Sequence, residues 1–163
     1  MNRLILICSL FLTYYAKAGN SLTGSQINIH SRDTTSLGIG IDSLNIGSTY
    51  IVQVESNGCF HHSDLLLRIN RKKQGYFASF QMKGKIEGKG IKKEYPAKLL
   101  TAEQIDSVRN FEIRLRNLAQ VNKNCTTVDK YLLTVNSQTA TYVIDDCEWQ
   151  GIGRLVGYLF RKQ

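Results

Sequence analysis

The densest group of side chains that could bind a metal ion or act as a nucleophile is Cys59-Phe60-His61-His62, followed by Asp64. A cysteine thiolate and imidazoles are typical ligands of zinc or copper. Structural zinc sites usually pair ligands two to four residues apart and add a second such pair, which this sequence lacks. On an extended strand Cys59 and His61 share a face while His62 points away. We therefore expect no resident metal or cofactor, with Cys59, His61 and His62 as weak metal-binding candidates.

The same residues suggest a small enzyme as the alternative function, with Cys59 as nucleophile and His61 as base. Cysteine catalysis needs a base in hydrogen-bond reach of the thiol and a third group that orients the base. Residues two apart on a strand do not normally place an imidazole on a sulfur atom. The sequence also has no GxSxG, HExxH or Walker motif. These observations favour a protein that is not an enzyme.

Positive charge is concentrated between residues 68 and 98, which hold ten basic and two acidic residues. Such a region on a nearly neutral body is typical of proteins that bind polyanions: anionic lipid headgroups, acidic polysaccharides or nucleic acids. Eight of the ten are lysines, which favours diffuse attraction over bidentate recognition. The alternative is a solvated strand surface whose lysines block edge-to-edge aggregation. The predicted binding residues are Arg68, Arg71, Lys72, Lys73, Lys83, Lys85, Lys89, Lys92 and Lys93.

Residues 1–18 have the three parts of a secretory signal peptide. Arg3 supplies the positive charge, an apolar run follows it, and Ala16-Lys17-Ala18 is a small-x-small cleavage site. The apolar run is shorter than the roughly 20 residues that cross a bilayer. We expect cleavage after Ala18, export to the periplasm or the extracellular space, and no transmembrane span afterwards. Cleavage removes two basic residues and lowers the net charge from +8 to +6.

Export to an oxidising compartment favours disulfides among the three cysteines beyond residue 18, which are Cys59, Cys125 and Cys147. We predict a Cys125–Cys147 bond, because these two residues flank a predicted β-hairpin, and a free Cys59. The hairpin register argues against this pairing, since it sets Cys125 opposite Glu148. A bond from Cys59 to either partner is the alternative.

Several segments have the composition of strands, rich in β-branched and aromatic residues and bounded by turn residues. The predicted strands are residues 50–54, 65–69 and 76–80, an edge strand at 91–100 that contains Pro96, and a hairpin of 128–135 with 139–145. Residues 56–58 and 70–75 are predicted turns, and the glycine-rich segment 83–90 is predicted as a hairpin tip or loop. In the hairpin we expect Tyr131 to face Tyr142 and Leu133 to face Ala140.

Two segments have helical periodicity. Thr101 and Gln104 form a capping box ahead of apolar residues spaced three and four apart, from Ile105 to Leu118. A second, short helix is expected between Trp149 and Phe160. The order of elements predicts an α+β fold, in which an antiparallel sheet of about five to six strands in hairpins is covered by two helices.

The sequence predicts a signal peptide at residues 1–18, a loosely structured lead-in at 19–48 with one short strand near residues 26–30, and a single α+β domain at 49–163. The function it favours is a non-catalytic binding or inhibitor-like module of the cell envelope or extracellular space. Its partner would be a polyanion or an envelope or extracellular protein, contacted through the basic hairpin region. A purely structural envelope component is a further possibility.

Overall fold

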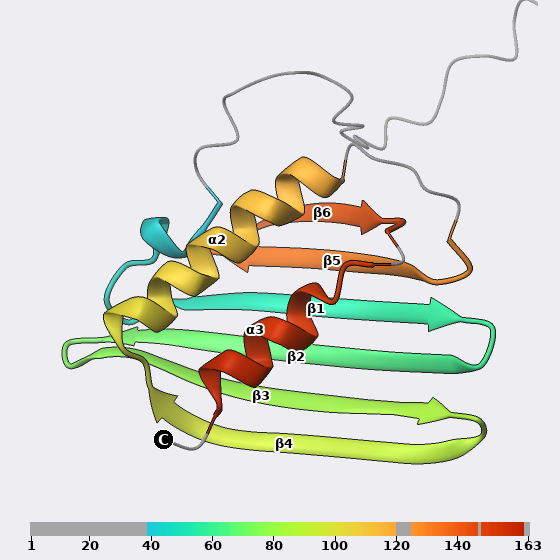
Figure 1. Ribbon diagram of the computed structural model, residues 1–163. Coiled ribbons are helices and arrows are strands. Elements are labelled where there is room, and N and C mark those ends of the chain that lie inside the picture. The colour runs from blue at the N-terminus through green and yellow to red at the C-terminus, as the bar shows by residue number, and fades with distance from the viewer. Residues whose placement is uncertain (1–38, 120–124, 147, 162–163) are drawn as a thin grey trace, which may run out of the picture. The chain divides into compact units, whose positions relative to one another are not determined.

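The computed structural model describes residues 39–119, 125–146 and 148–161 (Figure 1). They lie within one compact unit, residues 34–163. The predicted signal peptide and the predicted strand near residues 26–30 lie outside the described residues.

The described residues form one six-stranded sheet in which every neighbouring pair is antiparallel. The spatial order is β4-β3-β2-β1-β5-β6, so the first four strands form a meander and the last two form a hairpin that pairs with β1. Strands β4 and β6 are therefore the sheet edges, and the Pro96 strand lies at an edge as predicted. The bounds are β1 Thr49–Gly58, β2 His61–Lys72, β3 Gly75–Ile86, β4 Lys89–Leu99, β5 Val128–Val135 and β6 Gln138–Ile144.

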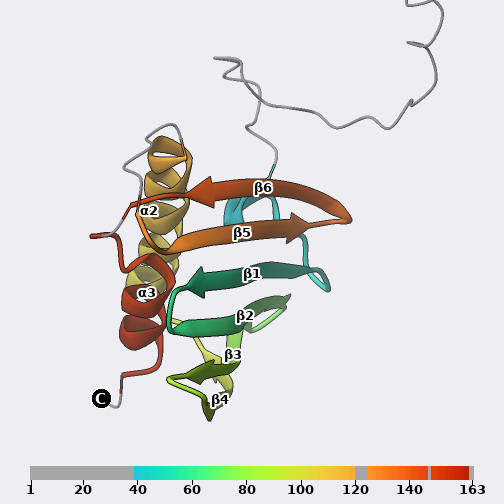
Figure 2. The same ribbon diagram turned by 90° about the vertical axis from the view of Figure 1, so that its right-hand side faces the viewer.

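Both α-helices of the described chain lie on the same side of the sheet (Figures 1 and 2). Helix α2, Ala102–Leu118, connects β4 to β5, and helix α3, Gly151–Leu159, follows β6. A short 3₁₀ helix, η1, Ile41–Ser43, contacts α2. Neither described α-helix is long and apolar enough to cross a membrane. The chain thus has the predicted α+β fold, an antiparallel sheet covered by two helices.

Alternation along the strands places the core between the sheet and the helices. Tyr50, Val52 and Val54 of β1 are buried, whereas the residues between them are not. The predicted register of β5 and β6 is confirmed, since Tyr131 faces Tyr142. The predicted capping box is also confirmed: the Gln104 N–H donates to the Thr101 hydroxyl, and the Thr101 N–H donates to Gln104 Oε1. The alternation along the strands determines which side of the sheet faces the core, and the cap determines where helix α2 begins.

The strands are longer than predicted, because residues assigned to turns stay in the ladder. Ser56 and Asn57 lie inside β1, where their side chains bond across to His61 and His62 of β2. The chain reverses at residues 59–60, beyond the predicted turn, and at residues 73–74, within the turn predicted at 70–75. The glycine-rich segment 83–90 is almost wholly strand. Its turn is only Glu87-Gly88, both with positive φ, as a tight two-residue hairpin requires.

The lead-in contributes more to the core than its polar composition suggests. Ile41 and Leu44 are fully buried. The backbone N–H of Ile41 donates to the Glu112 carboxylate at 2.8 Å, which anchors η1 to helix α2. Arg116 Nη2 also donates to the carbonyl of Ile39. Long-range contacts with α2 therefore order this segment, which has no strong local pattern of its own.

Candidate functional site

The face of the sheet opposite α2 and α3 has no described helix over it (Figure 2). We call it the open face, and it carries the side chains that alternate with the buried ones on each strand. Five of the nine predicted binding cations lie on it. On β2 and β3 they alternate with buried residues such as Leu67, Ile69 and Phe80. Lys92 of β4 lies on the same face because it stands opposite Lys83. The five are Arg68, Lys72, Lys83, Lys85 and Lys92.

The ladder register brings three of these cations close together. Lys83 on β3 stands directly opposite Lys92 on β4, and Lys85 follows Lys83 on the same face two residues along. Neighbouring strands lie about 4.8 Å apart and residues two apart lie about 6.8 Å apart. The three ammonium groups thus share one corner of the open face, beside the β3–β4 turn.

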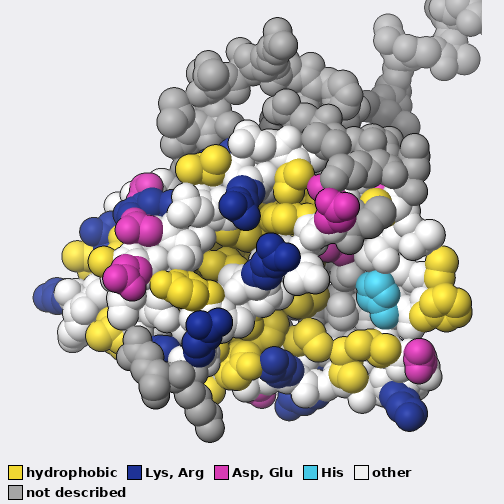
Figure 3. Space-filling view, in the orientation of Figure 1, with side chains coloured by type: hydrophobic (Ala, Val, Ile, Leu, Met, Phe, Trp, Pro, Cys, Tyr) yellow, Lys and Arg dark blue, Asp and Glu magenta, His cyan; other side chains and the backbone are white. Residues whose placement is uncertain are grey.

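The structure separates the other four predicted cations from this face. Arg71 turns toward the lead-in, where Nη1 donates to the carbonyl of Leu44 and the guanidinium lies 5.4 Å from the Tyr76 ring centroid. Lys93 lies over the Tyr95 ring on the helix side. Lys73 lies in the β2–β3 turn and Lys89 begins β4. The helix-covered side shows Lys and Arg side chains dispersed among hydrophobic and acidic ones rather than as a continuous basic area (Figure 3).

Three of the described carboxylates share the open face with these cations. Lys92 pairs with Glu94 at 3.6 Å, Lys130 pairs with Glu55 at 3.9 Å, and Asp64 of β2 stands opposite Lys83 in the ladder. Within the described part of the chain, Arg68, Lys83 and Lys85 have no ion pair within 4.0 Å. Lys72 instead lies 4.8 Å from the Phe77 ring centroid. The unpaired positive charge is therefore concentrated on β2 and β3.

The weak metal-binding candidates diverge. Cys59 is exposed in the β1–β2 turn. His61 hydrogen-bonds to Ser56 at 3.1 Å, whereas His62 bonds to Asn57 at 2.6 Å and lies 3.6 Å from Asp64. Among the described residues, no group of three or more His, Cys, Asp or Glu side chains could hold a metal ion.

Ser56 and His61 form a serine–histidine contact that was not predicted, because Ser56 was assigned to a turn. The two residues are brought together by the antiparallel β1–β2 pairing. Asp129 stands opposite Ser56 in the neighbouring strand β5 rather than beside the imidazole. A catalytic triad requires its carboxylate on the histidine, to orient the ring and stabilise its charged form. The arrangement therefore lacks the order of contacts that activates a serine nucleophile.

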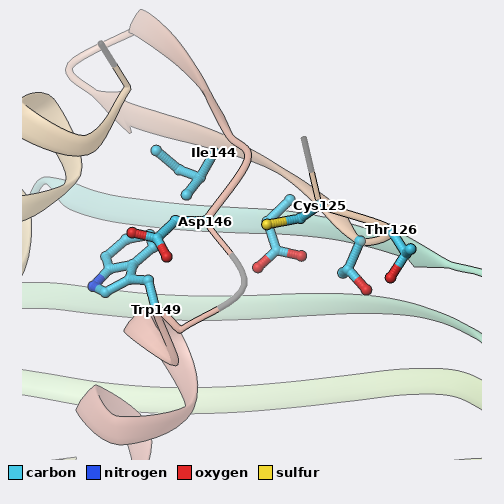
Figure 4. A pocket seen from close by; sticks show the side chains of 7 residues that line it. Cys125, Thr126, Ile144, Asp146 and Trp149 are labelled. Atoms are coloured by element: carbon cyan, nitrogen blue, oxygen red, sulfur yellow. The ribbon is translucent and has the colours of Figure 1, made fainter. Parts of the chain in front are cut away.

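A pocket of about 300 Å³ opens at the end of β5 and β6, next to the start of α3. Figure 4 shows Asp146 and Trp149 on one side of it and Cys125 and Thr126 on the other. Thr127, Asp129 and Ile144 complete the lining. Two carboxylates and an indole ring give the pocket an acidic, partly aromatic character, opposite in charge to the open face.

Asp129 and Tyr131 connect this pocket to the core. The Tyr131 hydroxyl lies 3.4 Å from Asp129 Oδ2, while Oδ1 is buried without a hydrogen-bond partner. Burial first, and then the nearby Asp129 charge, raise the pKa of Tyr131 well above its usual value. The Tyr131 ring also packs against Trp149, with centroids 5.2 Å apart. Tyr131 is thus a neutral, packed residue.

The described residues include two of the three cysteines beyond residue 18. Cys59 is free and exposed. Cys125 is disulfide-bonded, and its backbone N–H donates to the Asp145 carboxylate. Cys147 lies outside the described residues, so the Cys125–Cys147 pairing stays a prediction.

Comparison of this chain with protein-family models, with curated proteins and with solved structures finds no match.

Proposed function

We propose that this protein is an exported, non-catalytic binding module whose open face contacts a polyanion. The observation that carries the proposal is the group of Lys83, Lys85 and Lys92 at one corner of a face without a described helix over it, where Lys83 and Lys85 form no ion pair with a described residue. Surface charges that are not neutralised by neighbours generate the potential that attracts a ligand of opposite charge.

The spacing of the cations also supports a polymeric or multivalent anion. Lys83 and Lys92 lie on adjacent strands, one strand spacing apart, and Lys85 lies two residues from Lys83 on the same strand. Like charges directly opposite each other destabilise a sheet, and a bound anion relieves that repulsion. Lysine, as a flexible point charge, suits diffuse attraction to a chain or surface of anions.

The enzyme alternative has weaker support. The described cysteine and histidines do not converge, and the Ser56–His61 contact lacks a carboxylate on the imidazole. The acidic pocket is a concave feature, but its carboxylates are partly engaged: Asp146 accepts from the Glu148 N–H and Asp129 lies beside Tyr131. We therefore place the function on the open face.

The test is retention on a heparin resin in a salt gradient. The double variant Lys83→Gln/Lys85→Gln removes two open-face charges. The matched control, Arg114→Gln/Arg154→Gln, removes two exposed charges from the helices. We expect the open-face variant to elute at clearly lower salt and the control to elute close to the wild type. The difference should widen at low salt, because the Debye length is about 30 Å at 0.01 M and only about 10 Å at 0.1 M.

Equal losses in both variants would mean that only net charge matters and would contradict a site on the open face. Unchanged elution of the open-face variant would identify its lysines as a solvated surface.

A further inference from the structure

Two hairpin turns form one joined structure at the end of the sheet where β1 and β3 finish. The β1–β2 turn contains Cys59 and Phe60, and the β3–β4 turn contains Glu87 and Gly88. The backbone N–H of Glu87 donates to the carbonyl of Phe60 at 3.0 Å. Next to this bond, His61 pairs with Ile86. We call this joined pair of turns, residues 59–60 and 86–88, the sheet tip.

The sheet tip exposes large apolar side chains. Phe60 is 80% exposed and Ile86 is 48% exposed. Val128 at the start of β5 lies on the same end of the sheet, opposite Asn57, and is 40% exposed. A single exposed apolar residue is ordinary. Phe60 and Ile86 instead lie at neighbouring positions of two turns that the Glu87–Phe60 backbone hydrogen bond joins, so their apolar side chains are presented together at one end of the sheet.

Lysines flank the tip on both faces of the sheet. Lys89 stands opposite Ile86 in the β3–β4 ladder, whereas Lys83 and Lys85 come before Ile86 on β3 and lie on the open face. The acidic residue in the turn itself is Glu87. An apolar projection flanked by lysines is complementary to an anionic bilayer, which offers negative headgroups around an apolar interior.

We propose that the sheet tip docks on the surface of an anionic lipid bilayer. Phe60 and Ile86 enter the interface, while Lys83, Lys85 and Lys89 contact the headgroups. This inference rests on the proposed function, because it identifies the polyanion as a lipid surface. A soluble polysaccharide would require the lysines alone and would leave Phe60 without a role. Membrane attachment generally needs both an apolar and an electrostatic contribution, and the tip supplies the two together.

The test is co-sedimentation of the full chain with vesicles of phosphatidylcholine alone or of phosphatidylcholine mixed with phosphatidylglycerol. The tip variants are Phe60→Ser and Ile86→Ser. The matched control is Ile46→Ser, since Ile46 is 61% exposed but precedes β1 at the opposite end of the sheet. All three side chains are exposed, so the substitutions leave the core intact.

We expect binding only to vesicles that contain phosphatidylglycerol. Phe60→Ser should weaken it about tenfold or more, the effect of withdrawing one aromatic side chain from an apolar phase. Ile86→Ser should weaken binding less, and Ile46→Ser should bind as the wild type does. Lys83→Gln/Lys85→Gln should reduce both vesicle binding and heparin retention, whereas Phe60→Ser should reduce vesicle binding alone.

Two outcomes would overturn the membrane inference while leaving the proposed function standing: heparin retention through the open-face lysines without vesicle binding, or vesicle binding unchanged by Phe60→Ser. A wild-type protein that binds neither heparin nor anionic vesicles would overturn both proposals.

Discussion

Lys83 of β3 and Lys92 of β4 stand directly opposite each other on the open face, so two ammonium groups share one cross-strand pair. Lys92 has a carboxylate neighbour, Glu94, at 3.6 Å. Both partners of that pair are well exposed, and an ion pair of this kind contributes little. The sheet therefore retains a like-charge repulsion at this position.

The first prediction follows from this repulsion. Lys92→Thr should raise the free energy of unfolding by about 0.2–1 kcal/mol at low salt, because it removes one of two facing charges. The gain should shrink toward 1 M NaCl, where the Debye length is about 3 Å. The same variant should elute earlier from heparin. Denaturant unfolding at the two salt concentrations measures the stability change.

Lys93→Thr is the matched control on the same strand. Lys93 faces the helix side and lies over the Tyr95 ring, so its removal relieves no lysine pair. A salt-dependent gain of the same size in Lys93→Thr would contradict the assignment of the effect to Lys83.

The second prediction concerns the buried Glu112. Burial raises the pKa of its carboxyl above the ordinary value, against the opposing effects of the Ile41 N–H, Tyr50 and Arg116. The neighbouring Tyr50 hydroxyl is buried without a hydrogen bond of standard geometry, and burial followed by the Glu112 charge raises the pKa of Tyr50. A carboxyl with a raised pKa binds its proton more tightly in the folded state. Its contribution to stability is present below the unfolded pKa and is lost as the pH rises through the folded pKa.

Glu112→Gln keeps an acceptor for the Ile41 N–H and removes the titration. The free energy of unfolding of this variant, relative to the wild type, should therefore rise as the pH is raised from about 4 through 7. Urea unfolding at intervals of half a pH unit measures the difference. Glu94→Gln, which alters an exposed carboxylate on β4, is measured alongside for comparison. A relative stability of Glu112→Gln that stays flat or falls with pH would refute the raised pKa.

The third prediction concerns the disulfide. Non-reducing peptide mapping should recover the Cys125 peptide linked to the Cys147 peptide and a Cys59 peptide with a free thiol. Ser substitutions at Cys125 and Cys147 should lower stability by about 3 kcal/mol, the entropic effect of a loop of that length. Cys59→Ser should have almost no effect. A Cys59 peptide linked to either of the other two would show that the predicted pairing is incorrect.

The fourth prediction concerns export. Intact-mass measurement of the protein recovered from its own cells should give a chain that begins at Gly19, because Ala16 and Ala18 occupy the two small-residue positions of the cleavage site. A chain that keeps Met1, or a lipid on Cys8, would contradict the assigned signal peptide.

The fifth prediction concerns Gly151, the first residue of α3. A Cβ atom there would lie 2.6 Å from the Trp149 ring, which stacks on Phe111 with centroids 5.7 Å apart. Alanine is the better helix former by up to about 1 kcal/mol. Even so, Gly151→Ala should destabilise the protein by about 1–3 kcal/mol, because the packed ring cannot move away freely. Gly153→Ala, where a Cβ meets nothing within 4 Å, is the control and should be neutral or stabilising.

Local chemistry was enough to predict helix α2, the register of β5 with β6 and the edge position of the Pro96 strand. The Thr101 cap involves atoms only three residues apart. Alternation on a hairpin determines which side chains share a face once the turn is known. Such features depend on contacts between residues that are close in sequence, so a short segment is enough to predict them.

The turn predicted at residues 56–58 is wrong because cross-strand contacts override the local preference for a turn, whereas the hairpin tip predicted within 83–90 is present at Glu87-Gly88 with longer strands on either side. Ser56 and Asn57 have turn-forming side chains, but bonds to His61 and His62 keep them in the ladder. The same is true of the lead-in, where Ile41 is ordered by a bond to Glu112, 71 residues away. No sequence window that contains one partner alone can reveal a contact over such a separation.

The basic region also combines a feature that the sequence predicts with one that only the tertiary structure determines. Its composition pointed to the segment 68–98, but only tertiary structure separated the cations by face. Alternation on β2 and β3 sends Arg68, Lys83 and Lys85 to the open face, while Arg71 bonds to Leu44 of the lead-in. The sheet tip is likewise not visible in the sequence, because Phe60 and Ile86 are far apart along the chain and the antiparallel pairing of β2 with β3 places Ile86 opposite His61, the residue after Phe60. Charge content is a property of the chain, whereas a surface exists only once pairing has determined which side chains stand together.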